Sequence, residues 1–197
     1  MNELKFVYGP VPSRRMGESL GISPIPKKTC NYSCIYCQLG RTNKLSNERM
    51  EFFAVSDIIN ELKTYLKHGV QFDVITLVGE GEPALYLKIG DLISQIKELT
   101  SKPVAVITNG SLLYDKSVQN ELSKADIVLP SLDAYDDNTF KKINRPHGKL
   151  NFMRCYITQC IKASYGFNYP KREGVLLEKV LSILQMPVVI GSYEMLK

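Results

Sequence analysis

Short apolar runs alternate with amphipathic segments from Glu18 to Leu132. Parallel strands that are buried on both faces appear as short continuous apolar runs, and their crossover helices repeat apolar residues at helical spacing. The runs that predict strands span 19–25, 73–78, 103–108 and 126–132. The pattern therefore predicts an α/β fold built from repeated strand–loop–helix units.

Three amphipathic segments separate these strands. The first begins at Ser56, a candidate N-cap, and Gly69 is placed to end it. The other two span 89–99 and 115–124, where apolar residues recur at helical spacing. In each unit a loop rich in glycine, asparagine or acidic residues follows the carboxyl end of a strand, so we expect the functional residues to meet at one rim.

The repeat becomes irregular after Leu150. Residues 175–184 resemble one more helix and 187–191 one more strand, but nothing after them supplies another crossover helix. We therefore expect about four or five βα units.

Composition and charge are ordinary for one globular domain, with 44% apolar and 23% charged residues among 197. No stretch approaches the roughly 20 apolar residues that span a bilayer, and the N-terminal MNELKFVYG has no export signal, so we expect no membrane role. Five cysteines without a leader favour the reducing cytoplasm. The net charge of +5 permits a phosphate-bearing or RNA partner, but no dense basic tract indicates one.

Cys30, Cys34 and Cys37 lie within eight residues, in TCNYSCIYCQ. Thiolates on one short loop can converge on a soft metal centre, and three of them leave a four-iron cluster with one unligated iron. An odd triplet cannot pair fully into disulfides. Structural zinc needs a fourth ligand, and His68 and His147 lie far downstream without a pairing pattern. The spacing therefore favours an iron-sulfur site.

This loop resembles the cysteine signature of the radical S-adenosylmethionine (radical SAM) superfamily, with Tyr36 as the aromatic residue before the last thiol. GEGEP at Gly79–Pro83 is similar to the glycine-glutamate-proline motif of that superfamily and follows the second strand, as it does there. YGPVPSRR at 8–15 and NRPHGK at 144–149 look like a subgroup of small radical enzymes related to the tRNA wyosine-forming proteins.

The resemblance implies an incomplete TIM-like partial barrel of parallel strands, with a [4Fe-4S] cluster held by Cys30, Cys34 and Cys37. It implies that S-adenosylmethionine is cleaved reductively to start hydrogen abstraction from an unknown substrate, with electrons from a reductant such as flavodoxin or ferredoxin. The residues that it assigns to S-adenosylmethionine are Tyr36, Gly79, Glu80, Gly81, Glu82, Thr108, Asn109, Ser131 and Asp133. Several of these also suit plain roles, since glycine and asparagine commonly form turns and a loop tyrosine can cover apolar surface.

The superfamily core usually has six βα units, whereas the family-like sequence ends here near Leu150. We therefore expect a core-like region at 1–150 and a divergent tail at 151–197 that packs on it, as a truncated or frameshifted product would have. Two alternatives stay open: a non-catalytic iron-sulfur or zinc-binding module, and an inactive or partner-dependent fragment of a radical enzyme.

Further candidates come from single residues outside the two main motifs. They are three arginines for an anionic substrate (Arg14, Arg15 and Arg145), His147 as a proton donor, and Cys155 and Cys160, which we expect to be ordinary semi-buried cysteines rather than ligands of a second cluster.

Overall fold

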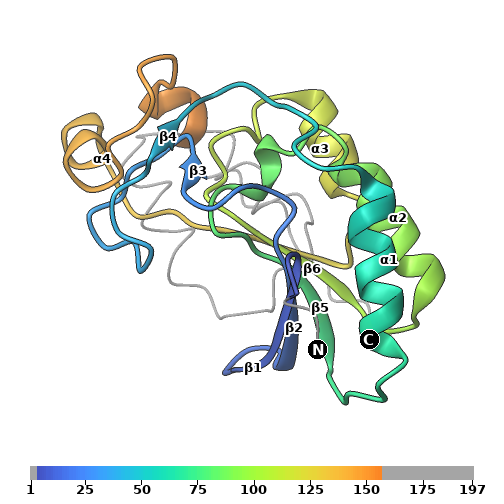
Figure 1. The fold of residues 1–197 in the computed structure, drawn as a ribbon. Helices are drawn as coiled ribbons and strands as arrows, with labels where there is room; N and C mark the ends of the chain where they lie inside the picture. The colour runs from blue at the N-terminus through green and yellow to red at the C-terminus, as the bar shows by residue number, and fades with distance from the viewer. Residues whose placement is uncertain (1–3, 157–197) are drawn as a thin grey trace, which may run out of the picture.

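The computed structural model describes residues 4–156, which form a mixed sheet with helices against one face (Figure 1). The elements in chain order are β1 (Val7–Ser13), β2 (Gly17–Ile22), β3 (Thr29–Cys30), β4 (Lys44–Leu45), α1 (Val55–Leu66), β5 (Val74–Leu77), the 3-10 helix η1 (Pro83–Leu85), α2 (Ile89–Leu99), β6 (Val104–Thr108), α3 (Lys116–Leu122), β7 (Ile127–Pro130) and α4 (Asp137–Ile143).

The main sheet has the strand order β1-β2-β5-β6-β7. Strands β2, β5, β6 and β7 are parallel. Helices α1, α2 and α3 lie between successive members of this set, and α4 follows β7. This arrangement confirms the predicted α/β fold and gives four βα units within the described part of the chain. Strand β2 ends at Ile22, earlier than predicted, because prolines at 24 and 26 lack the N–H that would continue the ladder.

Strand β1 and helix α4 were not predicted. Strand β1 pairs antiparallel with β2 at the sheet edge, and its register shifts between Tyr8 and Val11. Its prolines are tolerated because an edge strand has one side without ladder bonds. Helix α4 buries only Phe140 among its seven residues, so no periodic apolar pattern reveals it.

Helices α1, α2 and α3 lie side by side over one face of the sheet (Figure 1). The predicted N-cap of α1 was wrong: the helix begins at Val55 after Ala54, and Ser56 lies in its first turn. The apolar face of Ile58, Ile59 and Leu62 sets the position of this helix, without a side-chain cap.

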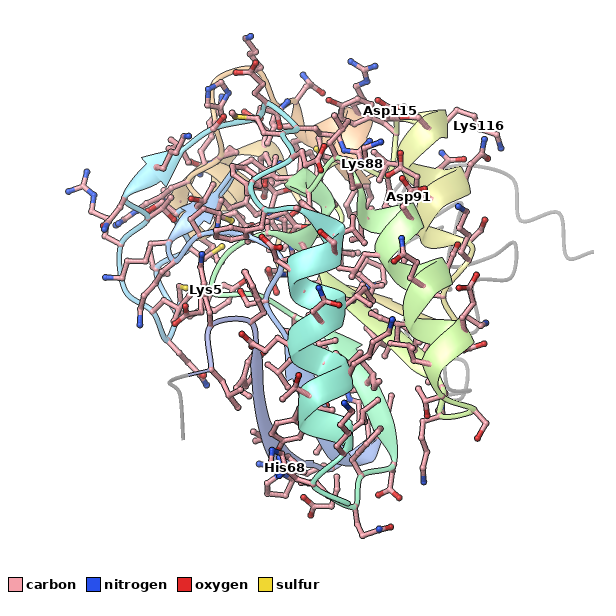
Figure 2. All side chains as sticks on the ribbon, turned by 45° about the vertical axis from the view of Figure 1, so that its right-hand side comes forward. Lys5, His68, Lys88, Asp91, Asp115 and Lys116 are labelled. Atoms are coloured by element: carbon pink, nitrogen blue, oxygen red, sulfur yellow. The ribbon has the colours of Figure 1, made fainter. Side chains whose placement is uncertain are left out.

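The helix starts lie at the same end of the molecule as the carboxyl ends of the parallel strands. Figure 2 shows Lys88 and Asp91 at the start of α2, and Asp115 and Lys116 at the start of α3, at one end, with His68 just beyond α1 at the other. The loops that follow the strands therefore gather at one rim, as predicted.

Two apolar clusters support this rim. The larger fills the space between the sheet and its helices and includes the fully buried Leu20, Ile75, Ile93 and Val106. The smaller one, which we call the aromatic cluster, packs against the cysteine loop and consists of Tyr32, Ala134, Phe140, Phe152, Cys155 and Tyr156.

Some expectations lie outside the described residues. These are the helix at 175–184, the strand at 187–191, the packing of most of the tail, and Cys160. Within residues 4–156, no helix combines the length and the apolar character needed to cross a membrane.

Candidate functional site

The cysteine loop leaves the end of β2 and lies between β3 and β4, which pair in parallel. Cys30, Cys34 and Cys37 are all half-buried, whereas Ile35 and Tyr36 between them are more than half exposed, at 58% and 55%. Among the described residues, no three cysteine, histidine or carboxylate side chains already stand in a metal-binding arrangement. The thiols thus share one loop without a preformed ligand cage.

Nitrogen donors point at two of the three sulfurs. The Tyr32 amide and the Asn109 side chain donate to Cys30 Sγ, over 3.4 and 3.7 Å. The Asn144 side chain donates to Cys34 Sγ over 3.5 Å. Such donors stabilise negative charge on sulfur, so this environment suits thiolates that ligate a metal.

Two of the loop thiols, Cys30 and Cys34, have a raised pKa in the metal-free protein. Burial, followed by the charge of Glu82, raises the pKa of Cys30 to about 12. Burial also raises the pKa of Cys34. A bound cation reverses this balance, because a coordinating thiol loses its proton to the metal. Metal binding at this loop would therefore release protons.

The Gly79–Glu82 motif packs directly against the residues that precede Cys30. The Lys28 amide donates to the Glu80 carbonyl over 2.5 Å, and the Glu82 amide donates to the Thr29 carbonyl over 3.1 Å. A Cβ at Gly81 would collide with that same Thr29 oxygen. The glycine is therefore required by the close approach of two main chains.

The Glu82 side chain joins the ends of β5 and β6. It is 2% exposed and accepts hydrogen bonds from Thr108 Oγ1 (2.5 Å), the Asn109 amide (2.7 Å) and the Ala84 amide (2.9 Å). Burial raises the pKa of this carboxyl above its ordinary value. Glu82 and Thr108 thus hold the motif in place, and their predicted contact with a ligand stays a prediction.

Two further predicted residues follow β7. Ser131 and Asp133 are exposed, and the Ser131 amide donates to the Thr108 carbonyl over 2.9 Å. The Tyr36 hydroxyl donates to the Asp133 carboxylate, as does Asn144 Nδ2 over 3.0 Å. Burial and then the bond to Asp133 raise the pKa of Tyr36. The structure therefore brings the cysteine loop and the ends of β6 and β7 together, as predicted.

Asn31, inside the cysteine loop, is a polar residue that the sequence did not single out. It is fully buried, and its Nδ2 donates to Ser111 Oγ (2.6 Å) and Asn47 Oδ1 (3.0 Å). Its Oδ1 accepts from Asn109 Nδ2 over 2.7 Å. The side chain thus fixes the loop to the β6 end, and only the fold reveals these distant partners.

The 143–147 segment, which overlaps the NRPHGK motif at 144–149, forms a strap along the cysteine loop. The amides of Ser33 and Ile35 donate to carbonyl oxygens of this strap, over 2.9 Å each. The His147 amide donates back to the Asn31 carbonyl over 2.8 Å. The strap therefore fixes the main chain on both sides of Cys34.

The other candidate residues differ in exposure and in hydrogen bonding. Arg14, Arg15 and Arg145 are exposed. His147 Nδ1 accepts the Lys149 amide over 3.2 Å. Cys155 is 3% exposed in the aromatic cluster, with Sγ 3.5 Å from the Ser111 carbonyl oxygen, and is thus more buried than the semi-buried cysteine that we expected.

Positive charge is concentrated around the loop. Residues 24–47 and 138–154 contain nine lysines and arginines and no acidic residue, although the whole chain has 25 basic and 20 acidic residues. Lys27 pairs with Glu80 (2.9 Å) and Lys141 with Asp137 (2.6 Å), both at exposed positions. Since the strap contacts the cysteine loop, these two segments bring an excess of basic residues to it, although the Glu80 and Asp133 carboxylates also lie beside them.

Comparison with known sequences gives a family match. The sequence profile of the Radical SAM superfamily matches residues 25–156. The match includes the cysteine loop, the Gly79–Glu82 motif and the ends of β5, β6 and β7. It covers more than half of the chain.

Curated relatives extend the comparison. The chain is 48% identical over 148 residues to a protein named GTPase Obg from Brachyspira hyodysenteriae, covering 75% of this chain and 22% of that protein. It is 38% identical over 149 residues to the UPF0026 protein MJ1312 of Methanocaldococcus jannaschii (75% and 46%), and 46% identical over 141 residues to a UPF0026 protein of Synechocystis (71% and 52%). The chain thus spans about half of these relatives or less.

A solved structure shares the fold. The structure of TYW1 with a lysine-pyruvate adduct bound aligns with a TM-score of 0.52 and 16% identity, covering 75% of this chain and 51% of that one. This likeness confirms the expected partial-barrel arrangement of the parallel strands.

Proposed function

Since this chain belongs to the radical SAM superfamily, we propose that Cys30, Cys34 and Cys37 hold a [4Fe-4S] cluster beside a site for S-adenosylmethionine. The observation that carries the proposal is the set of nitrogen donors directed at Cys30 and Cys34. A cluster held by these thiolates would supply the one-electron reduction that cleaves S-adenosylmethionine and starts hydrogen abstraction from a substrate.

The donor set favours iron over structural zinc. A closed zinc site needs four protein ligands, and the loop offers three thiols. Three thiolates instead suit a four-iron cluster that keeps one iron open to a ligand.

Residues at the rim have separate proposed roles toward S-adenosylmethionine. Tyr36, Ser131 and Asp133 are exposed and can contact its adenosine or methionine groups. The main chain of Gly79 and Glu80 lies next to the cysteine loop and offers carbonyl oxygens to an amine. The remaining predicted contacts hold this main chain in position: Gly81 through packing, and Glu82, Thr108 and Asn109 through hydrogen bonds.

The electron donor is proposed to be an acidic protein such as a flavodoxin or ferredoxin. The excess of basic residues around the cysteine loop attracts an acidic partner and increases its rate of association at low salt. We further propose that residues 1–150 are the radical SAM core of the protein. The curated relatives extend beyond the region that matches this chain, and such added regions help to determine the substrate, so we assign no substrate.

Anaerobic reconstitution with iron and sulfide tests the proposal. We expect about four irons per chain, and reduction with S-adenosylmethionine should release 5′-deoxyadenosine. Cys34→Ala should lose both, while Cys155→Ala, a thiol outside the loop, should keep its iron. Stoichiometric zinc without iron would favour the metal-binding module instead. A fully loaded wild type that forms no 5′-deoxyadenosine would contradict the catalytic part alone.

A further inference from the structure

The strap at 143–147 enters the function proposed above only through the Asn144 donor at Cys34, and its main chain also fixes the residues beside Cys34. We propose that Asn144 in this strap is a positioning residue that orients the Cys34 thiolate and raises the reduction potential of the cluster. The inference rests on the proposed function, since it concerns the same cluster.

The side-chain nitrogen of Asn144 donates hydrogen bonds to two acceptors. Its Nδ2 donates to Cys34 Sγ over 3.5 Å and to Asp133 Oδ2 over 3.0 Å. Both partners are acceptors, so the amide nitrogen rather than the oxygen must face them, and the orientation of the group is fixed by its neighbours. The residue is 2% exposed, so water does not compete well for these bonds.

Asp133 connects this amide back to the cysteine loop. The Tyr36 hydroxyl also donates to Asp133 Oδ2. Hydrogen bonds therefore link Cys34 to Asn144, Asn144 to Asp133, and Asp133 to Tyr36, which lies in the same loop as Cys34. These bonds hold Cys34 and Tyr36 at a fixed distance from the end of β7.

The main chain supports the same geometry. Ser33 and Ile35, the neighbours of Cys34, donate their amides to the carbonyl oxygens of Asn144 and Ile143, over 2.9 Å each. Arg145 has φ of +46°, and this left-handed turn lets its carbonyl also approach the Ser33 amide, at 3.2 Å. These bonds do not use the Asn144 side chain, so changing that side chain leaves the main-chain clamp in place.

The charge on sulfur explains the effect on the potential. Reduction adds negative charge to the cluster and its thiolates, and an N–H donor stabilises that charge more in the reduced state than in the oxidised state. In a buried setting the bond is stronger than in water. Removing the donor should therefore make the cluster harder to reduce.

The test is an electron paramagnetic resonance titration of the reconstituted protein in the absence of S-adenosylmethionine. Asn144→Ala should shift the midpoint potential to more negative values. Asn144→Asp should shift it further, because a carboxylate replaces the donor beside Cys34. Asn144→Ser retains a hydroxyl donor and should lie closer to the wild type. Asn138→Ala, an exposed position on α4, should leave the potential unchanged.

The outcomes separate this inference from the proposed function. A wild type that binds no iron contradicts the proposed function before any Asn144 variant is measured. A loaded Asn144→Ala protein with the wild-type potential overturns the inference alone. If Asn144→Ala loads poorly, the potential of the remaining cluster and that of Asn144→Ser still decide the matter, because a midpoint does not depend on occupancy.

Discussion

Replacement of Gly81 by alanine tests whether the turn after β5 must approach the main chain before Cys30. The new Cβ would collide with the Thr29 carbonyl oxygen and lie 2.8 Å from Ile25 Cδ1. The isoleucine can rotate, but Thr29 is main chain, and its oxygen also accepts the Glu82 amide (3.1 Å). Overpacking costs about 1–3 kcal/mol, and the weakened hydrogen bond adds about 1 kcal/mol. We expect the free energy of unfolding to fall by about 2–4 kcal/mol.

Urea denaturation of the metal-free protein, followed by circular dichroism, measures this effect. Gly148→Ala is the matched control: in the part of the chain that the structure describes, no atom lies within 4 Å of a Cβ there, so we expect a change below about 1 kcal/mol. Gly79→Ala should be intermediate, because its nearest neighbours lie 3.3–3.4 Å away. Similar small effects at all three glycines would refute the packing argument.

Three further predictions address the surroundings of the site. Arg49→Lys should lower the free energy of unfolding by about 1–3 kcal/mol, because lysine cannot replace the guanidinium that joins Glu121 to the carbonyls around η1; an unchanged urea midpoint would contradict this. Burial raises the pKa of the Glu82 carboxyl above its ordinary value of 4.5, so the folded protein binds this proton more tightly than the unfolded chain. The free energy of unfolding of the wild type should therefore fall relative to that of Glu82→Gln as the pH rises above 4.5. A difference between the two proteins that stays constant with pH in urea titrations would count against this prediction. Lys142→Glu should slow cluster reduction by an acidic flavodoxin and weaken its salt dependence in stopped-flow measurements, whereas reduction by dithionite serves as the control.

The buried parallel strands could be predicted because each is a continuous apolar run. Strand β5 (Val74–Leu77) is buried at every position, so its burial needs no alternation to be recognised. Strand β1 could not be predicted in this way, since Gly9, Pro10 and Pro12 interrupt its sequence. Its position depends on pairing with β2, which is a tertiary interaction.

The residues of the candidate site also differ in how far the sequence could predict their positions. Residues in the loops that follow strands, such as Asn109 after β6 and Asp133 after β7, could be placed at one rim because parallel strands end together. The inward turn of Glu82 was not foreseen, although Glu82-Pro83 is a usable helix-start signal for η1. The contacts of Asn31 and of Asn144, the first residue of NRPHGK, were not predicted. An asparagine suits a surface turn as well as a buried network, and their partners lie far away in sequence.

The distance along the chain between Cys34 and its donor also has a consequence for biosynthesis. The two residues are 110 positions apart. At about 5–20 residues per second, a ribosome needs on the order of 5–20 seconds to add Asn144 after Cys34. During that interval the nascent cysteine loop exists without its strap. For the proposed cluster, we therefore expect iron delivery to be productive only after translation has passed the strap.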